Sequence, residues 1–163
     1  MALSRGNHRE AILTNRKPAR LVSLFLLLAA CFVALPAKAA PLIIHAGGSA
    51  YKFEVELATT PDQRAQGLMF RKAMAANAGM LFLYPSEQAV SFWMKNTLIP
   101  LDMLFVKADG RIARIAHNAR PLDETPISSD APVNAVLELN GGTADQLGIK
   151  EGDRVEYQTV PSS

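Results

Sequence analysis

The sequence predicts a mainly β fold: a small antiparallel β-sandwich or barrel with one or two short helices. Three observations predict it. Apolar and charged residues alternate along short segments, turn-forming residues separate these segments, and only two short stretches carry helix start and stop signals. Residues 40–163 number 124, the length of one domain with one hydrophobic core. We therefore expect a single β-rich domain over residues 40–163.

The clearest strand runs from Tyr51 to Leu57. Its odd-numbered residues are apolar and its even-numbered residues are charged, so one face lies on a core and the other in water. Ala108-Asp109-Gly110 predicts a hairpin turn further along, because glycine adopts a positive φ without steric cost. The other segments expected to form strands are 42–45, 80–84, 90–95, 103–107, 111–117, 133–139 and 154–159.

The first of the two helices is expected to begin after Thr60. Thr60 matches an N-cap, Pro61 matches the first helical position, and Gln63 matches the capping-box partner of Thr60. Gly67 then matches the glycine that ends a helix.

The second helix is expected to begin with Thr143 as its N-cap and to end at Gly148. The segment 119–132 separates two predicted strands. It carries three prolines and several acids without any periodicity, which predicts a long surface loop.

Residues 1–39 have the anatomy of a secretory signal peptide. Basic residues precede a continuous apolar run over residues 21–35, and small residues occupy the −3 and −1 positions of a cut after Ala39. The apolar run is too short for a comfortable bilayer span. We therefore expect a periplasmic or secreted protein whose mature chain begins at Ala40 and has no transmembrane span.

Cys31 is the only cysteine, and it lies inside the apolar run of the leader. The mature chain would therefore have no disulfide and no thiol nucleophile. Residues 28–31 also resemble a bacterial lipobox, in which Cys31 would become a lipid-anchored N-terminus. The residues after Cys31 stay apolar and a small-residue cleavage site follows them, so cleavage after Ala39 is our expectation and the lipid anchor is the alternative.

The charge of the expected mature domain excludes one class of partner. Residues 40–163 contain eleven basic and fourteen acidic residues, a net charge of −3. A mildly acidic domain lacks the basic face that nucleic-acid binding requires. We therefore expect a small molecule or a protein as partner, and no nucleic acid.

Three central segments are apolar on both faces: 80–84, 92–94 and 103–106. A strand that is apolar on both faces needs cover on both sides. Two short helices and a polar loop cover only part of this area. The rest must lie inside a closed barrel, against another subunit, or in a groove that a ligand fills.

Four residues form the predicted ligand-binding site. Arg71, Asn96 and Asp102 are polar residues within apolar blocks, and Trp93 points from the strand face opposite Phe92. In one interpretation Arg71 pairs with Asp102, Asn96 holds a turn and Trp93 packs in the core. In the other, the three polar residues form the floor of a pocket, Arg71 binds a carboxylate or phosphate, and Trp93 is an aromatic platform at its mouth.

A small periplasmic hydrolase is the alternative function. His117 lies at the end of a predicted strand and could act as a general base with the carboxylates of the long loop, which are Asp123, Glu124 and Asp130. No serine lies in a Gly-x-Ser-x-Gly motif, so a serine nucleophile of that type is not expected.

A copper-binding protein is the second alternative, because thioether and imidazole groups suit Cu(I). The methionines and histidines do not occur at ligand spacing, and methionine is also an ordinary core residue. We therefore expect no metal and no cofactor. The residues concerned are Met69, Met74, Met80, Met94, Met103, His45 and His117.

Several blocks together carry a family resemblance over residues 50–157. They include Glu56-Leu57-Ala58, Gly67-Leu68-Met69-Phe70-Arg71, Phe92-Trp93-Met94-Lys95-Asn96-Thr97, Pro100-Leu101-Asp102 and Val136-Leu137-Glu138-Leu139-Asn140-Gly141-Gly142. In these blocks the chain resembles domain of unknown function 192, a family of small and often exported bacterial and archaeal proteins. The resemblance implies a compact, mainly β fold, and it implies no established activity, substrate or cofactor. Our interpretation is an exported, non-enzymatic binding or interaction module with an apolar groove near Trp93.

Overall fold

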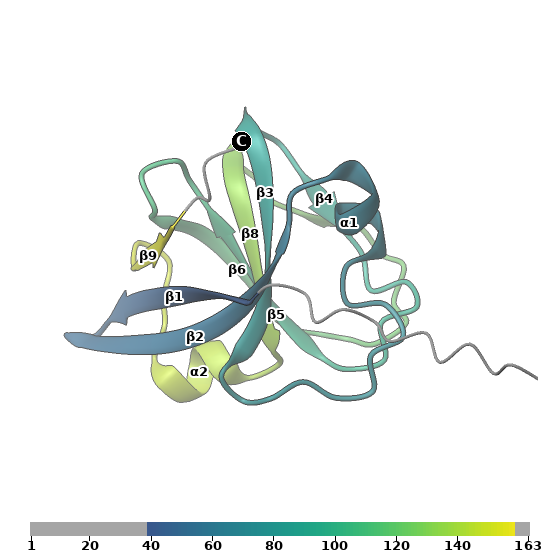
Figure 1. Cartoon of the computed structure of the whole chain (residues 1–163), viewed down its shortest axis with the longest axis horizontal. Helices are drawn as coiled ribbons and strands as arrows, with labels where there is room; N and C mark the ends of the chain where they lie inside the picture. The colour runs from purple at the N-terminus through teal and green to yellow at the C-terminus, as the bar shows by residue number, and fades with distance from the viewer. Residues whose placement is uncertain (1–38, 159–163) are drawn as a thin grey trace, which may run out of the picture. The chain divides into compact units, whose positions relative to one another are not determined.

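The computed structural model describes residues 39–158, so the predicted leader up to residue 38, with Cys31, lies outside the described residues. Nine strands and two short helices make up this part of the chain (Figure 1). In chain order they are β1 (Ala39–Ala46), β2 (Ser49–Ala58), α1 (Pro61–Gln66), β3 (Ala78–Gln88), β4 (Ser91–Phe92), β5 (Leu101–Val106), β6 (Ile112–Ala119), β7 (Ile127–Ser128), β8 (Val133–Asn140), α2 (Thr143–Leu147) and β9 (Arg154–Tyr157). The predicted mainly β fold with two short helices is confirmed.

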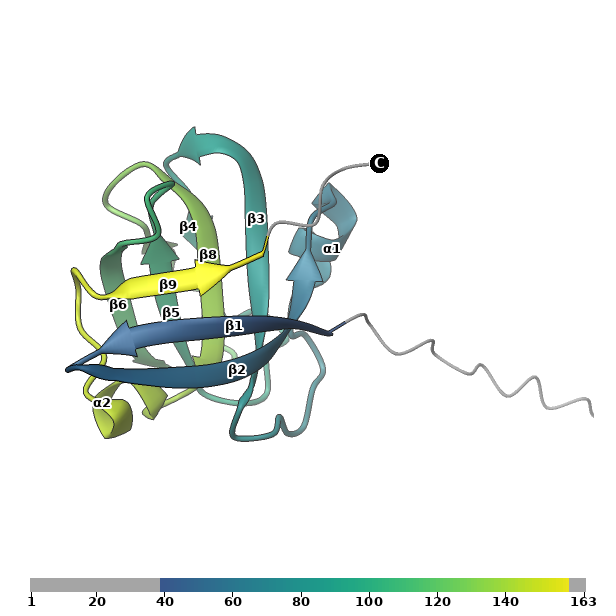
Figure 2. The same ribbon diagram turned by 60° about the vertical axis from the view of Figure 1, so that its left-hand side comes forward.

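Seven of the strands form one sheet in the order β6-β5-β8-β3-β2-β1-β9. The sheet curls into a half-barrel, and Figure 2 shows β1, β2 and β9 crossing in front of the central strands. Every neighbouring pair is antiparallel except β2 and β3, which run parallel from Glu54↔Ala78 to Ala58↔Phe82. The sequence predicted a purely antiparallel sheet, and the parallel β2–β3 pair shows that this prediction is wrong at one position. The segment from residue 59 to residue 77, which contains α1, is long enough to return the chain to the same end of the sheet.

The two edges of the sheet approach each other through the predicted hairpin turn. The Gly110 carbonyl accepts a hydrogen bond from the Val155 backbone N–H at 2.8 Å, and the Ile112 N–H donates to the Asp153 carbonyl at 2.9 Å. Gly110 has φ +84°, as the turn prediction requires. These contacts join the β5–β6 hairpin to β9 and bring the two edges of the curled sheet close together.

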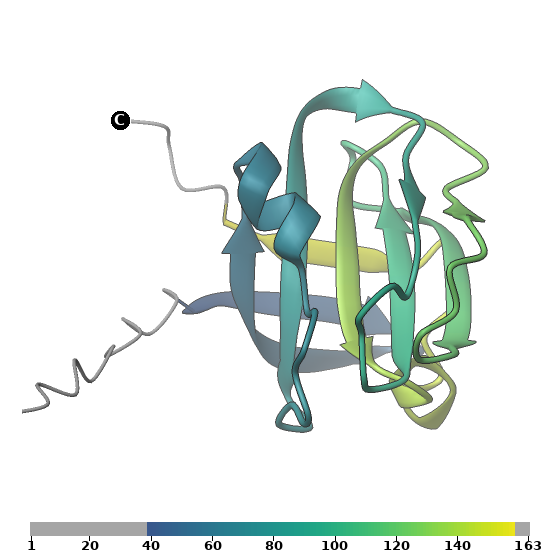
Figure 3. The same cartoon turned by 90° about the vertical axis from the view of Figure 1, so that its right-hand side faces the viewer.

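The sheet buries both of its faces, as the two-faced apolar segments predicted. The first core contains residues of both edge strands, such as Ile112 and Val155, and therefore lies inside the curl. The second core lies on the other face and contains Met80, Phe82 and Phe105. Figure 3 shows α1 and the segments around β4 and β7 on the side of the central strands away from β1 and β9. The loops beside these elements add buried residues such as Leu68 and Ile99 to the second core.

The local signals for α1 are confirmed. Thr60 is the N-cap, and its side chain accepts a hydrogen bond from the Gln63 N–H at 3.2 Å while the Gln63 side chain accepts one from the Thr60 N–H at 3.0 Å. The helix ends at Gly67, whose φ is +47°. Two expectations for other segments differ from the structure. Only Ser91–Phe92 of the predicted strand 90–95 is extended, and it pairs with Ile127–Ser128 inside the predicted loop 119–132.

Candidate functional site

The pairing predicted between Arg71 and Asp102 is wrong. The Arg71 guanidinium instead donates one hydrogen bond to each carboxylate oxygen of Glu56, the second at 2.6 Å from Nη2 to Oε2. This ion pair raises the pKa of Arg71. Glu56 lies on β2, one of the charged positions of the alternating segment, and the pair therefore fastens the loop after α1 to the sheet.

Asp102 is fully buried on β5 and binds backbone groups. Its Oδ1 accepts hydrogen bonds from the N–H groups of Asn118 at 2.7 Å and Gly142 at 3.0 Å, and its Oδ2 accepts one from Ala144 at 2.7 Å. The N-cap of α2 is Gly142, which has no capping side chain, and Thr143 is the first helical residue instead of the predicted N-cap. Asp102 supplies the missing cap from a neighbouring strand.

Asn96 lies in a turn, but its side chain contacts a methionine sulfur and not the backbone groups that one interpretation predicted. Its φ is +56°, its carbonyl accepts a hydrogen bond from the Phe70 N–H at 2.8 Å, and its side-chain amide lies 3.8 Å from the Met69 sulfur. This turn follows β4, which is shorter than the strand expected over residues 90–95. Asparagine tolerates the left-handed conformation better than other non-glycine residues do.

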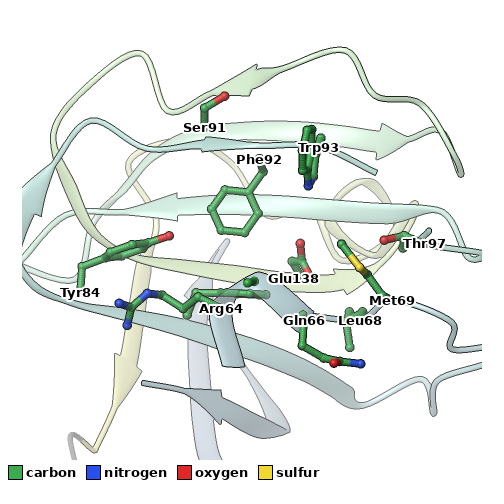
Figure 4. A pocket seen from close by; sticks show the side chains of 13 residues that line it. Arg64, Gln66, Leu68, Met69, Tyr84, Ser91, Phe92, Trp93, Thr97 and Glu138 are labelled. Atoms are coloured by element: carbon green, nitrogen blue, oxygen red, sulfur yellow. The ribbon is translucent and has the colours of Figure 1, made fainter. Parts of the chain in front are cut away.

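A cavity of about 340 Å³ lies outside the curl of the sheet, between the end of α1 and β4. Trp93 lines it and is 48% exposed. Arg71, Asn96 and Asp102 do not line it, so the structure does not bring the four predicted ligand-binding residues together. The lining residues are Arg64, Ala65, Gln66, Gly67, Leu68, Met69, Phe82, Tyr84, Ser91, Phe92, Trp93, Thr97 and Glu138 (Figure 4).

Aromatic rings form much of the cavity wall. Phe92 of β4 meets Phe82 of β3 edge-to-face, with ring centroids 5.0 Å apart and an interplanar angle of 88°. Tyr84 follows on the same face of β3, and the Arg64 guanidinium lies 5.0 Å from its ring centroid. The Lys95 ammonium lies 5.2 Å from the ring centroid of Trp93. The cavity therefore has an apolar, aromatic wall and two cationic groups stacked on aromatic rings at its border.

Glu138 is the acidic group of the cavity, and only 4% of its surface is exposed. It lies on β8, between β3 and β5, and its cross-strand neighbours are Met80 on one side and Met103 on the other. Figure 4 shows its carboxylate pointing from the sheet toward Phe92 and Trp93. Within residues 39–158 no side chain or backbone group forms a hydrogen bond or ion pair with it.

Burial raises the pKa of Glu138 from 4.5 to about 8. Desolvation is the whole cause, because the charged form has lost water and has gained no cation or hydrogen-bond donor. A buried, unpaired acid with a strongly shifted pKa in an aromatic cavity is a mark of a functional site. The sequence analysis missed Glu138, although it is the one charged residue within the apolar segment 133–139.

Four large apolar side chains are exposed among the described residues: Phe70, Trp93, Leu98 and Leu122. Phe70 and Leu122 have positive φ values of 64° and 63°, which are strained for such residues. Backbone hydrogen bonds hold both conformations, because Phe70 donates to Asn96 and Leu122 donates to the Thr97 carbonyl at 3.2 Å. Phe70 and Leu122 therefore keep strained backbone conformations while their side chains are exposed to solvent.

His117 has an acidic partner, but this partner is not one of the predicted loop carboxylates. Its Nδ1 lies 3.1 Å from Oδ1 of Asp145 on α2, and both side chains are largely exposed. They line a shallow depression that also contains Glu151. The loop acids bind elsewhere: Asp130 contacts Arg114 at 3.1 Å, and Asp123 accepts a hydrogen bond from the Thr125 N–H at 2.9 Å.

The histidines and methionines of the copper hypothesis lie in different surroundings. Met80, Met94 and Met103 are buried in the second core. His45 is exposed on β1 and contacts Glu156 at 3.0 Å, much as His117 contacts Asp145. No group of three or more His, Cys, Asp or Glu side chains converges within the described part of the chain.

No helix between residues 39 and 158 is long and apolar enough to cross a membrane. Gly141 and Gly142 form a turn ahead of α2, and the Gly141 N–H donates to the Pro100 carbonyl at 2.8 Å. A Cβ at Gly141 would lie 2.5 Å from the Asn118 side chain, so only glycine fits there.

Solved structures that are similar to this chain include one from Sinorhizobium meliloti and one from Novosphingobium aromaticivorans. A protein from Sinorhizobium meliloti 1021, provisionally described as a transcription regulator, is 45% identical, with a TM-score of 0.74 over 76% of this chain and 97% of that one. A protein of unknown function from Novosphingobium aromaticivorans DSM 12444 is 47% identical, with a TM-score of 0.71 over 72% of this chain and 84% of that one. No curated protein matches the sequence.

A family model confirms the resemblance drawn from the sequence blocks. The model of domain of unknown function 192, described as "Uncharacterized ACR", matches residues 42–157. The match begins in β1 and ends in the last strand, so it spans the whole curled sheet. The chain therefore belongs to the family of domain of unknown function 192.

Proposed function

We propose that this protein is an exported binding protein, and that a small molecule with an apolar body occupies the cavity between Trp93 and Glu138. The observation that carries the proposal is Glu138, a buried acid at the cavity floor without a partner among the described residues. Leaving such a group unpaired costs stability, and a ligand that meets it would recover that cost. The cavity volume of about 340 Å³ lies within the range of small-molecule sites.

The predicted leader supports export, and the start of the fold agrees with the predicted cleavage site. β1 begins at Ala39, and Ala40 already pairs with Val55. A cut after Ala39 would therefore remove the leader and leave the paired strand from Ala40 onward intact. The description of the Sinorhizobium meliloti protein would favour a role at DNA, but eleven basic and fourteen acidic residues between positions 39 and 158 argue against a nucleic-acid surface here.

Native mass spectrometry of the full chain, expressed with its own leader and recovered from the cell envelope, tests the proposal. We expect wild-type protein to carry an additional small-molecule mass. Trp93→Ala removes an aromatic wall of the cavity and should reduce the occupied fraction. Leu122→Ala is the matched control, because it removes an exposed apolar side chain that does not line the cavity. Bare protein in all three samples, or equal occupancy in wild type and Trp93→Ala, would contradict the proposal.

The exposed His117–Asp145 pair supports a second candidate function, a hydrolase that uses His117 as a general base. Asp145 could orient the imidazole, as acids do in catalytic pairs. The residues that line this depression include no serine, threonine or cysteine, so the base would have to activate water. Ester and phosphoester hydrolysis that disappears in His117→Ala and persists in His45→Ala would support this candidate.

A further inference from the structure

We propose that the ligand carries a cationic amine on its apolar body, and that Glu138 is the residue that recognises the amine. This inference rests on the proposed function, because it names the ligand class of the same cavity. It also assigns a binding role to a residue for which the fold provides no structural partner.

The position of Glu138 explains why the chain itself cannot neutralise it. On the face that Glu138 shares with the second core, its cross-strand neighbours Met80 and Met103 are both buried. Neither thioether donates a hydrogen bond. The carboxylate therefore has one open direction, into the cavity. A group entering from that side is the one that can pair with it.

The wall of the cavity favours a cation as that group. Phe92, Trp93 and Tyr84 present aromatic rings around the space that the carboxylate faces (Figure 4). The face of an aromatic ring attracts an ammonium ion, and most strongly where water is excluded. A carboxylate combined with several rings is selective for an amine, because each component stabilises positive charge. At pH values of about 8 and above, where Glu138 is ionised, an anion would be repelled by the same carboxylate.

The cationic side chains near the cavity are already engaged. Arg64 donates to the carbonyls of Thr59 at 2.6 Å and Leu83 at 3.0 Å, and its guanidinium points away from Glu138 in Figure 4. Lys95 stacks on the ring of Trp93. Tyr84 is the other titratable side chain of the lining, and burial raises its pKa, so it stays neutral. None of these groups supplies the charge that Glu138 lacks.

Binding would move one proton. The protonated Glu138 carboxyl and an ammonium ligand give a carboxylate–ammonium pair and one released proton. Because burial holds the pKa of Glu138 near 8 in the absence of ligand, amine affinity should rise as the pH rises from 6 to 8. A neutral ligand of the same shape should bind without this pH dependence.

Three probes of matched shape test the inference: 2-phenylethylamine, 2-phenylethanol and 3-phenylpropionate. Trp93 is the only tryptophan of the chain and lines the cavity, so its fluorescence reports binding directly. In wild-type protein at pH 8 we expect the amine to bind about tenfold or more tightly than the alcohol, because a charge-assisted hydrogen bond is stronger than a neutral one. The propionate should bind more weakly than either.

Glu138→Gln should reduce the preference for the amine to within about threefold and leave alcohol binding in place. Glu54→Gln is the matched control, because it removes the same charge from an exposed position on β2 and should keep the wild-type preference. Equal binding of amine and alcohol in wild type, tighter binding of the propionate, or an unchanged preference in Glu138→Gln would overturn the inference while the proposed function stands. Failure of all three probes to bind would contradict both.

Discussion

The Asp102 carboxylate accepts a hydrogen bond from the Ala144 backbone N–H at 2.7 Å, and so caps α2 from strand β5. It accepts two more from Asn118 and Gly142. One acid on β5 therefore satisfies backbone donors at the end of β6 and at the start of α2. This arrangement gives Asp102 a structural role.

Asp102→Asn should destabilise the fold by about 2–4 kcal/mol, because the amide keeps one acceptor oxygen and turns an N–H group toward a backbone donor. Urea denaturation of the purified domain measures the change. Asp62→Asn, at an exposed position in the first turn of α1, is the control and should stay within about 0.5 kcal/mol of wild type. A change of that small size at Asp102 would show that the three backbone hydrogen bonds do not hold α2.

The ion pair between Arg71 and Glu56 leads to a second prediction. Double-mutant cycles with Arg71→Ala should give a coupling energy of about 1 kcal/mol with Glu56→Gln, because the pair is bidentate and partly shielded from water. The cycle of Arg71→Ala with Asp102→Asn should give a coupling near zero. Denaturation curves of the five variants and wild type provide both cycles. A larger coupling with Asp102 would restore the pairing inferred from the sequence.

The sequence predicts the local features well, because short-range chemistry determines them. The alternation from Tyr51 to Leu57 becomes part of β2, and the capping box of Thr60 and Gln63 begins α1 as expected. Two of the three two-faced apolar segments, 80–84 and 103–106, correctly indicated a sheet that buries residues on both faces, whereas 92–94 lies outside this sheet. Each of these signals lies within a few residues of the feature that it predicts.

The pairings of polar residues could not be predicted in the same way, because they join segments far apart in the chain. The sequence analysis paired Arg71 with Asp102 and expected Glu56 to face water. The parallel β2–β3 pair, which follows from the path of the chain after α1, brings Glu56 beside Arg71. The sequence analysis did not single out Glu138, for a different reason. An acid in a strand normally faces water, and only the register against Met80 and Met103 shows that this one faces a covered core.

The export proposal has its own measurement. The protein recovered from the cell envelope should have an intact mass that corresponds to a chain beginning at Ala40, because the cleavage pattern places the cut after Ala39. Ala39→Phe puts a bulky residue at the −1 position and should leave the leader uncleaved. A mature N-terminus at a lipid-modified Cys31, abolished by Cys31→Ser, would instead establish the lipoprotein alternative.

The buried Glu138 predicts an unusual dependence of stability on pH. Its pKa of about 8 in the folded state exceeds the reference value of 4.5, so the folded protein holds a proton that the unfolded chain releases between these values. The free energy of unfolding should therefore fall as pH rises from about 5 to 8, by up to about 1.4 kcal/mol per pH unit from this group. The stabilising contribution is complete below pH 4.5 and is lost as the pH passes about 8.

Glu138→Gln isolates this effect, because the amide resembles the protonated acid in shape and stays neutral throughout. The variant should match wild type at pH 5 and exceed its stability at pH 8.5 by several kcal/mol, as expected when a buried unpaired charge is removed. Urea denaturation at both pH values measures the difference. Glu54→Gln should follow the wild-type curve, because Glu54 is exposed on β2. If Glu138→Gln and wild type keep the same difference at both pH values, Glu138 has a cation or hydrogen-bond donor as partner, and the ligand site loses its principal residue.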